Sequence, residues 1–420
     1  METAHSRPQS LWKNADFLKF WCGQTISEIG SHITRDGLPL LAVLTLGATP
    51  LQMGLLSAAG SLPVLLVSLH AGVWVDRLRR RPVMMAADAG LALALLTVPL
   101  AHFLGVLRIE QLYLVAMLTG VLAVIFDLAY HAYLPSLVER DHLVEGNSKM
   151  AFSESVAELA GSSLAGILVQ LLTAPVAILV DSLSFLASLL GIAAIRKPEP
   201  PPAPAREVAS VSQELREGLR FVFSSPVLRA LAFVESTHSF FGSFFGVLYS
   251  LYTIRDLGLT PAAVGLTIAM GGAGNLLGAL LAAPMARRLG LGRTLLFALL
   301  ASAAATLLIP LAGGPMALVL VMMFAAQLVG DGLSSVYAIH ETSLRQAVTP
   351  DRLLGRARSS VTVLTAALYP LGALVAGALA DTLGARVTLL IAVGGFFLSA
   401  LWLVFSPVLR LTDHPLPEES

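Results

Sequence analysis

Four ionisable side chains interrupt an apolar stretch near the start of the chain: Glu28, His32, Arg35 and Asp36. At 100° per residue, their spacing places all four on a helical stripe about 100° wide. In a membrane, an ionisable side chain at mid-depth costs about 3 kcal/mol or more unless it meets a partner or water. We therefore expect this stripe to line a polar cavity. The structural alternative is a self-neutralising cluster in which His32 bridges Glu28 and Asp36.

Other apolar stretches also contain ionisable and aromatic side chains. Asp127, Tyr130 and His131 share one face of a stretch, Glu235 and His238 lie three residues apart in another, and Asp331 lies near the middle of a third. A proton carrier in a membrane is a buried carboxylate or a histidine, which titrates near neutral pH. The predicted carriers are Asp36, Asp127, Glu28 and Asp331, with His32 and His131 as alternatives or partners. The predicted substrate contacts are Arg35, Tyr130, Glu235, His238, Tyr249 and Glu158. For each of these residues, a packing role is the alternative.

The composition predicts the surroundings of these side chains. Hydrophobic residues make up 56% of the 420 residues, charged residues make up 13%, and the mean hydropathy is +0.78. A soluble domain has about twice that share of charge, so we expect a multi-pass membrane protein. The 27 basic and 27 acidic residues balance, which gives no indication of nucleic acid as a partner. The single cysteine, Cys22, excludes an intrachain disulfide. Since the sequence has no P-loop, metal-site or hydrolase motif, we expect no cofactor and no enzymatic activity.

Long apolar runs predict the membrane topology. A membrane-crossing helix needs about 20 mostly apolar residues. Twelve stretches qualify: 17–45, 51–75, 83–106, 111–137, 149–172, 176–195, 229–254, 261–286, 294–312, 315–342, 357–380 and 386–407. Nearly all loop arginines and lysines lie on the side of the two termini, and the other side has only Arg108, Arg255 and Arg386. The positive-inside rule then places both termini in the cytoplasm.

The chain also divides into two similar halves. Residues 49–55, which enter the second span, resemble 260–266, which enter the eighth; likewise 138–143 resemble 348–353. Matches at one offset of about half the chain indicate an internal duplication, which is typical of transporters. Between the halves, a proline-rich linker leads into an amphipathic segment that we expect on the cytoplasmic membrane surface. The predicted domains are an N-terminal six-helix half (1–195), the linker (196–228) and a C-terminal six-helix half (229–420).

The most specific motif lies between the second and third spans. It reads Gly72-Val-Trp-Val-Asp76-Arg77-Leu-Arg-Arg80-Arg81, which is a glycine, an Asp-Arg pair four residues on and further arginines. Together with the twelve spans and the two halves, it resembles the major facilitator superfamily. Segments 133–141, 147–148 and 217–221 are similar to the exporter branch that contains enterobactin and macrolide efflux proteins.

The resemblance implies an all-α integral membrane fold of twelve helices in two six-helix repeats, with a central cavity lined by spans one, four, seven and ten. It assigns Gly72, Asp76, Arg77, Arg80 and Arg81 to a conformational gate. The alternative is that the arginines pin the loop to anionic lipid. The chain departs from the family pattern at Gly161-Ser162, where related antiporters often carry Gly-Pro. It also lacks the arginine that many of them have in the fourth span.

These observations predict a secondary transporter in the cell membrane. We expect proton-driven efflux of a small hydrophobic or amphipathic compound, of a drug or siderophore-like kind, by alternating access. The predicted partners are this substrate, protons and the lipid bilayer, and we expect a monomer. The alternatives are a proton-coupled importer and a non-transporting membrane sensor on the same fold. The intact gate loop argues against the sensor.

Cysteine labelling tests the topology. With Cys22 replaced by serine, Ser210→Cys in the 196–228 loop should react with a membrane-impermeant thiol reagent only after the cells are opened. Leu107→Cys, in a predicted outer loop, should react in intact cells. Reaction of the 196–228 loop in intact cells would contradict the predicted orientation.

Overall fold

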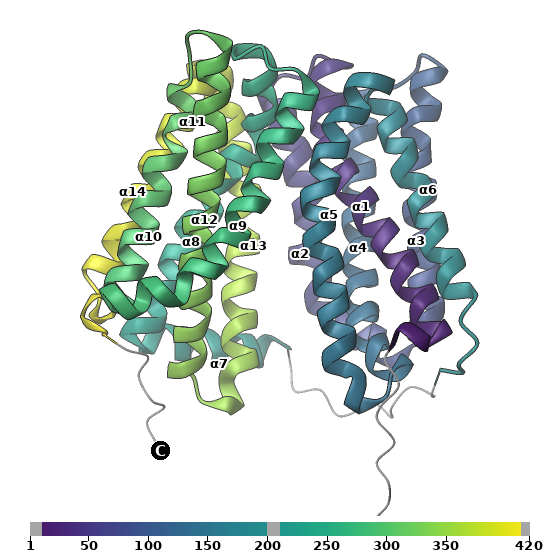
Figure 1. The fold of residues 1–420 in the computed structure, drawn as a ribbon, viewed down its shortest axis with the longest axis horizontal. Helices are drawn as coiled ribbons and strands as arrows, with labels where there is room; N and C mark the ends of the chain where they lie inside the picture. The colour runs from purple at the N-terminus through teal and green to yellow at the C-terminus, as the bar shows by residue number, and fades with distance from the viewer. Residues whose placement is uncertain (1–10, 200–210, 413–420) are drawn as a thin grey trace, which may run out of the picture. The chain divides into compact units, whose positions relative to one another are not determined.

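The computed structural model describes residues 11–199 and 211–412, apart from the side chains of residues 68–77, 140, 211 and 212. Within these residues the chain forms helices and no strand (Figure 1). The α-helices are α1 (Ala15–Leu44), α2 (Pro50–Arg77), α3 (Arg80–Phe103), α4 (Ile109–Leu137), α5 (Leu143–Leu172), α6 (Ala174–Ala193), α7 (Val211–Ser224), α8 (Pro226–Leu251), α9 (Pro261–Leu289), α10 (Leu291–Thr306), α11 (Leu308–Leu311), α12 (Met316–Val348), α13 (Asp351–Leu383) and α14 (Ala385–Val404). Short helical segments complete the chain: η1 (Leu11–Lys13), η2 (Arg140–His142), η3 (Tyr252–Asp256) and η4 (Pro407–Arg410).

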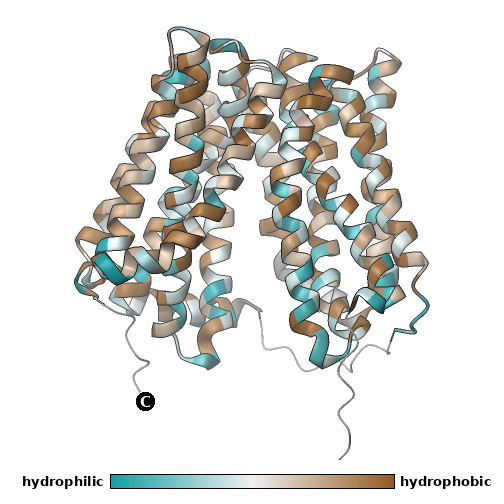
Figure 2. Cartoon of the chain, in the orientation of Figure 1, coloured by the Kyte–Doolittle hydropathy of each residue, from teal (hydrophilic) through white to brown (hydrophobic). Residues whose placement is uncertain are grey.

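A helix stands at each of the twelve predicted spans. Among the described residues, ten helical stretches are long and apolar enough to cross a membrane, with α10 and α11 counted together. The other two spans are α1, with 30 residues, and α8, with 26, which are also long enough to cross a membrane. Figure 2 shows hydrophobic residues along most of the length of these helices. The predicted class, an all-α integral membrane protein, is confirmed.

The chain forms two compact units. Unit 1 consists of Met1–Leu38 and Leu66–Arg206, and unit 2 consists of Pro39–Leu65 and Glu207–Ser420. The hairpin that joins α1 to α2 therefore belongs to unit 2, whereas the remainder of both helices belongs to unit 1. The predicted domain boundaries near residues 196 and 228 stay a prediction.

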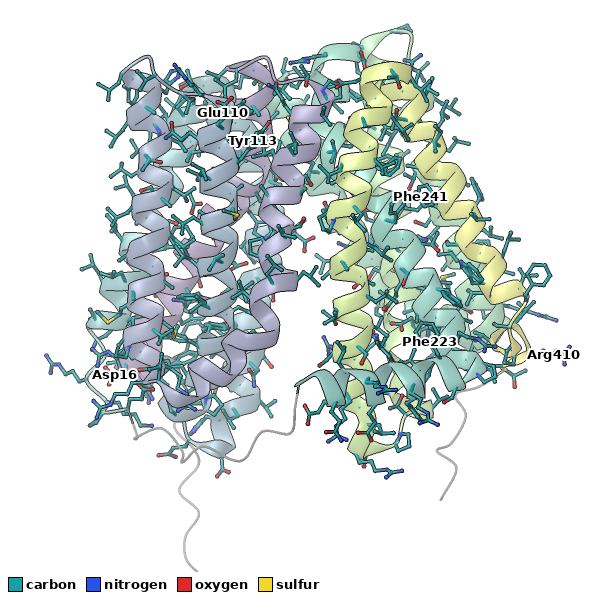
Figure 3. The ribbon with its side chains drawn as sticks, turned by 180° about the vertical axis from the view of Figure 1, so that it is seen from behind. Asp16, Glu110, Tyr113, Phe223, Phe241 and Arg410 are labelled. Carbon is teal, nitrogen blue, oxygen red and sulfur yellow. The ribbon has the colours of Figure 1, made fainter. Side chains whose placement is uncertain are left out.

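The core of unit 1 lies near the end of the unit that carries Asp16. In Figure 3, Asp16 and Glu110 mark opposite ends of this unit. The largest buried side chains come from α1, α3, α4 and α6: Phe17, Phe20, Met84, Tyr133 and Ile192. Because lipid is as apolar as these side chains, close van der Waals packing holds the helices together within the membrane. This packing fixes α1 against its neighbours.

Glycines allow the helices of unit 2 to pack closely. A Cβ at Gly274 or Gly278 of α9 would overlap the backbone of α12, at or near Gly332. Likewise, α13 meets the start of α2 at Gly377, where a Cβ would crowd the backbone of Gly54. Small-residue contacts of this kind are typical of membrane helices. They hold α9 and α12 in a fixed register.

Helix α7 is the predicted amphipathic helix, and it packs against α13. Arg356 of α13 donates a hydrogen bond of 2.6 Å to Glu217 of α7 and a second, of 3.3 Å, to Glu214. Figure 3 places Phe223 of α7 and Arg410 at the same end of unit 2. The helix is therefore fixed to the protein, in addition to the membrane contact that its sequence predicts.

The close approach of α7 to α13 depends on Gly218. A Cβ at Gly218 would overlap the Arg356 carbonyl and the Ser360 hydroxyl. We expect Gly218→Ala to destabilise the protein by about 1–3 kcal/mol, since it overpacks this contact. Gly355→Ala is the matched control, because it meets no atom within 4 Å and alanine favours the helix by about 1 kcal/mol. Thermal unfolding in detergent measures both variants, and a Gly218→Ala midpoint at or above that of Gly355→Ala would contradict the prediction.

Candidate functional site

Helix α1 packs closely against α5, and this contact buries part of the predicted polar stripe. A Cβ at Gly161 of α5 would overlap the His32 side chain, so glycine lets the helices approach. The hydroxyl of the next residue, Ser162, lies beside the Asp36 carboxylate as a hydrogen-bond partner. His32 is buried, and Oδ2 of Asp36 has no donor among the described residues. Gly161-Ser162, where the chain departs from the family pattern, thus contacts His32 and Asp36 of the stripe.

A different face of α1 contacts α6. Asp181 of α6 is buried and accepts a 2.9 Å hydrogen bond from Ser184. Gly30 of α1 leaves room for these two side chains, because a Cβ there would overlap both. Burial of a polar pair against α1 is favourable only when its hydrogen bonds are made. The Gly30 contact therefore fixes the position of α1 relative to α6.

A hydrogen-bond relay connects α1 to α3 through α6. Gln24 of α1 donates to Ser188 of α6 at 2.7 Å, and the Ser188 hydroxyl donates to Asp88 of α3 at 2.6 Å. Asp36, Asp88 and Asp181 each keep one buried oxygen with no donor among the described residues. Each of these three carboxyl groups thus has one buried oxygen and lies beside a serine.

The remaining predicted polar residues of unit 1 lie on an open face of α1, α4 and α5. Nδ1 of His131 lies 3.2 Å from Asp127, and the two side chains are 72% and 68% exposed. Glu28 is 43% exposed and interacts electrostatically with Glu154, Arg35 and Asp127. We call this surface the acidic face; its carboxylates are Glu28, Asp127, Glu154 and Glu158. Charges at this depth are not stable against lipid, so the acidic face requires water or a polar ligand.

An aromatic surface adjoins the acidic face. Tyr130 of α4 stacks on Phe20 with ring centroids 5.7 Å apart, and on Phe126 at 6.2 Å. The His131 ring meets Tyr130 edge-on at 5.2 Å. Tyr130 also interacts electrostatically with Glu28, so this tyrosine lies close to the carboxylates. An apolar ring beside negative charge is a suitable contact for an amphipathic cation.

Two predicted substrate contacts of unit 2 join helices to one another. Tyr249 of α8 forms a 2.8 Å hydrogen bond with Thr267 of α9. His238 of α8 stacks on Phe396 of α14, with ring centroids 4.7 Å apart and planes inclined by 17°. Both side chains thus take part in packing within unit 2.

The two predicted acids of unit 2 also lie at helix contacts. Asp331 of α12 lies against α9, where a Cβ at Gly271 would overlap its carboxylate. Glu235 of α8 lies 3.5 Å from Arg345 of α12, which connects these helices. Asp331 and Glu235 are therefore parts of two different contacts.

The predicted gate loop is described only in part. Helix α2 continues through Arg77, but the side chains of Gly72, Asp76 and Arg77 lie outside the described residues. Arg80 and Arg81 begin α3, and their backbone N–H groups donate to the Glu199 carboxylate at 2.5 and 3.1 Å. A carboxylate at this position satisfies free N–H groups and interacts favourably with the helix dipole. The linker thus caps α3 at Arg80 and Arg81, the last two residues of the gate motif.

Further contacts fix the start of the linker to unit 1. Asp16 accepts hydrogen bonds from the backbone N–H groups of Arg196 and Lys197, at 3.1 and 2.9 Å. A hydrogen bond from Lys19 lowers the pKa of Asp16, so the carboxylate stays ionised at neutral pH. The Lys197 ammonium donates to the carbonyl of Leu137 at the end of α4. These contacts place Glu199 within reach of α3.

The sequence-based predictions give no role to four residues that join helices or cap them in the structure. They are Ser162, Glu199, Arg345 and Glu341, which pairs with Arg345. The i,i+4 spacing of Glu341 and Arg345 favours an ion pair, and this signal is present in the sequence. Glu199 gives no such signal, because its partner Arg80 lies 119 residues away. Ser162 is visible in the sequence only as a departure from the family pattern.

The fold and these surfaces define a class. Long apolar helices with small-residue contacts form a multi-pass membrane protein, and charged side chains at membrane depth are typical of transport proteins.

The chain belongs to the transmembrane secretion effector family of the major facilitator superfamily, whose model matches residues 8–416. It is 31% identical over 397 residues to the multidrug efflux pump Tap of Mycolicibacterium fortuitum, covering 91% of this chain and 94% of that protein. It is 23% identical over 377 residues to macrolide efflux protein A of Streptococcus pyogenes, covering 89% and 91%. A solved mutant of the nucleoside transporter NupG shares the fold, with a TM-score of 0.78 at 11% identity, covering 93% of this chain and 99% of that one. The predicted fold and family resemblance are confirmed, and the chain is a transporter rather than an enzyme.

Removal of the Ser162 hydroxyl tests the contact between α1 and α5. The change takes a hydrogen-bond donor away from the buried Asp36 carboxyl. We therefore expect Ser162→Ala to lower stability by about 1–3 kcal/mol, measured as a lower midpoint of thermal unfolding in detergent. Ser163→Ala is the control, because the Ser163 hydroxyl donates to the Leu159 carbonyl of its own helix. Equal unfolding midpoints for the two variants would contradict the hydrogen bond between Ser162 and Asp36.

Proposed function

We propose that this transporter exports a small hydrophobic or amphipathic compound and is driven by proton entry. It acts as a monomer in the cytoplasmic membrane, with both termini in the cytoplasm. Its six-helix halves, 1–195 and 229–420, alternate access by moving about the linker 196–228. The similarity to the Tap multidrug efflux pump and to macrolide efflux protein A supports the direction of transport.

The position of Asp36 carries the proposal. One oxygen of its half-buried carboxyl group is enclosed, and Ser162 is a hydrogen-bond partner of the group, whereas the preceding residue, Arg35, is exposed next to the acidic face. A proton carrier must be buried enough to favour its neutral form and close enough to water to exchange its proton. Asp36 meets both requirements. Because α1 contacts α5 at this residue, gain or loss of the proton changes the charge inside a helix contact.

The acidic face supports a cationic amphipathic substrate. Glu28, Asp127 and Glu154 attract positive charge, and the ring of Tyr130 provides an apolar surface beside them. A substrate cation and a proton then compete for neighbouring carboxyl groups. This competition exchanges a proton for a substrate cation, because a carboxyl group that binds a proton loses the negative charge that attracts the cation.

Transport in proteoliposomes tests this proposal. With an imposed pH gradient and a panel of cationic dyes and antibiotics, we expect extrusion by the wild-type protein. Asp36→Asn should reduce gradient-driven extrusion to the level of protein-free liposomes, because an amide cannot carry a proton. Asp127→Asn should weaken extrusion and substrate binding together. Asp141→Asn, an exposed residue in a short segment, is the control and should transport normally.

The outcomes separate the alternatives. Gel-filtration profiles show whether each variant is folded. Uptake in the direction of proton flow would favour the importer. Gradient-driven extrusion that survives in Asp36→Asn would show that Asp36 is not the proton carrier. Binding without transport of any compound would favour the sensor.

A further inference from the structure

A buried acidic pair lies in unit 2, apart from the residues discussed above for unit 1. Glu341 of α12 is only 3% exposed, and its carboxyl lies within hydrogen-bonding range of Glu235 on α8, which is 26% exposed. Arg345, one helical turn after Glu341, bridges the two. Its Nη2 donates to Glu341 at 3.2 Å, and its Nη1 lies 3.5 Å from Glu235.

The charges of this cluster do not balance when both acids are ionised. Two carboxylates then face one guanidinium, and one negative charge stays uncompensated. Two ionised carboxylates also cannot hydrogen-bond each other, because both are acceptors only. One proton on the pair removes the excess charge and supplies the missing donor. Oε1 of Glu341 is buried without a donor among the described residues, as expected of a group that needs this proton.

Among the described residues, Arg345 is the one cation that interacts with the pair. The side chains that α10 and α14 pack around this part of α12 are apolar and include Leu295, Leu299 and Leu403. On α12 itself, the Thr342 hydroxyl donates to Glu341 at 3.3 Å, and His340 is directed to the Ala282 carbonyl of α9.

Tyr337 is the remaining titratable group at the pair. It lies one turn before Glu341 and interacts electrostatically with both acids and with Arg345. Its hydroxyl is buried without a partner among the described residues. Among those residues, Arg345 and Tyr337 are therefore the charged or titratable groups that face the pair.

We propose that Glu235 and Glu341 share one exchangeable proton, with Arg345 as their counter-ion, and form a proton-binding site in unit 2. The part-exposed Glu235 is the route by which the proton enters and leaves. Loss of the proton leaves two carboxylates that repel each other across the contact between α8 and α12. Only the link between this site and transport rests on the function proposed above, since the shared proton is a property of unit 2 alone.

Infrared spectroscopy detects this proton directly. In protein carrying ¹³C-labelled glutamate, the C=O stretching band of a protonated glutamic acid shifts away from that of any protonated aspartic acid. In lipid nanodiscs at neutral pH, we expect a shifted band in the wild-type protein. The band should be lost in Glu341→Gln and in Glu235→Gln, because each change removes one member of the pair. Should Glu341→Gln fail to fold, the part-exposed Glu235→Gln tests the same pair.

Two controls complete the design. Glu110→Gln changes an exposed glutamate at the end of unit 1 and should keep the band. Asp36→Asn should keep it as well, because its carboxyl is not a glutamate. A glutamic acid band that survives in both pair variants, or that is absent from the wild-type protein, would overturn the proposal.

Transport assays distinguish this proposal from the proposed function. If the band is lost in the pair variants but transport ignores the pH gradient, the shared proton stands and proton-driven export fails. If the band is unaffected in folded pair variants while transport follows the gradient, the proton pair fails and export stands.

Discussion

An ionisable side chain within a membrane protein must have a partner, reach water or lose its charge, because hydrocarbon solvates none of these groups. This constraint explains the helix contacts of both units. Gly161 brings α1 close enough for Ser162 of α5 to reach the Asp36 carboxyl, and Gly30 leaves room on α1 for the hydrogen-bonded Asp181 and Ser184 of α6. In unit 2, α8 and α12 place two acids beside one arginine. Glycine has no side chain, so it permits both close helix packing and the polar contacts that depend on it.

The constraint divides the polar residues of unit 1 into two groups with different chemistry. The buried group, represented by Asp36, is suited to a small ligand such as a proton, since a larger cation would have to separate α1 from α5. The acidic face is open and adjoins the ring of Tyr130, so it is suited to a larger cation. Since α1 carries residues of both groups, it connects proton binding to substrate binding in the proposed export.

The apolar runs predicted the twelve spans well, because the requirement for about 20 apolar residues leaves few alternatives. The sequence also indicated that Glu28, His32, Arg35 and Asp36 share one side of α1. It did not predict which of them are buried, because that depends on where α5 approaches. The linker acid Glu199 was unpredictable for a similar reason, since its partners are distant in the sequence. The predicted span 315–342 ended before Arg345, whereas α12 continues to Val348 and gives this arginine two carboxylate partners.

In the proposed function, the acidic face of unit 1 is a water-filled substrate surface within the membrane. Single cysteines on a Cys22→Ser background test it most directly, with Asp127→Cys on that face and Leu93→Cys on the exposed apolar side of α3. A small membrane-impermeant thiol reagent should modify Asp127→Cys, and a transported substrate should slow that reaction. Leu93→Cys should stay unmodified in lipid. If Asp127→Cys reacts no faster than Leu93→Cys, the acidic face is closed to water, which contradicts its proposed role as a substrate surface.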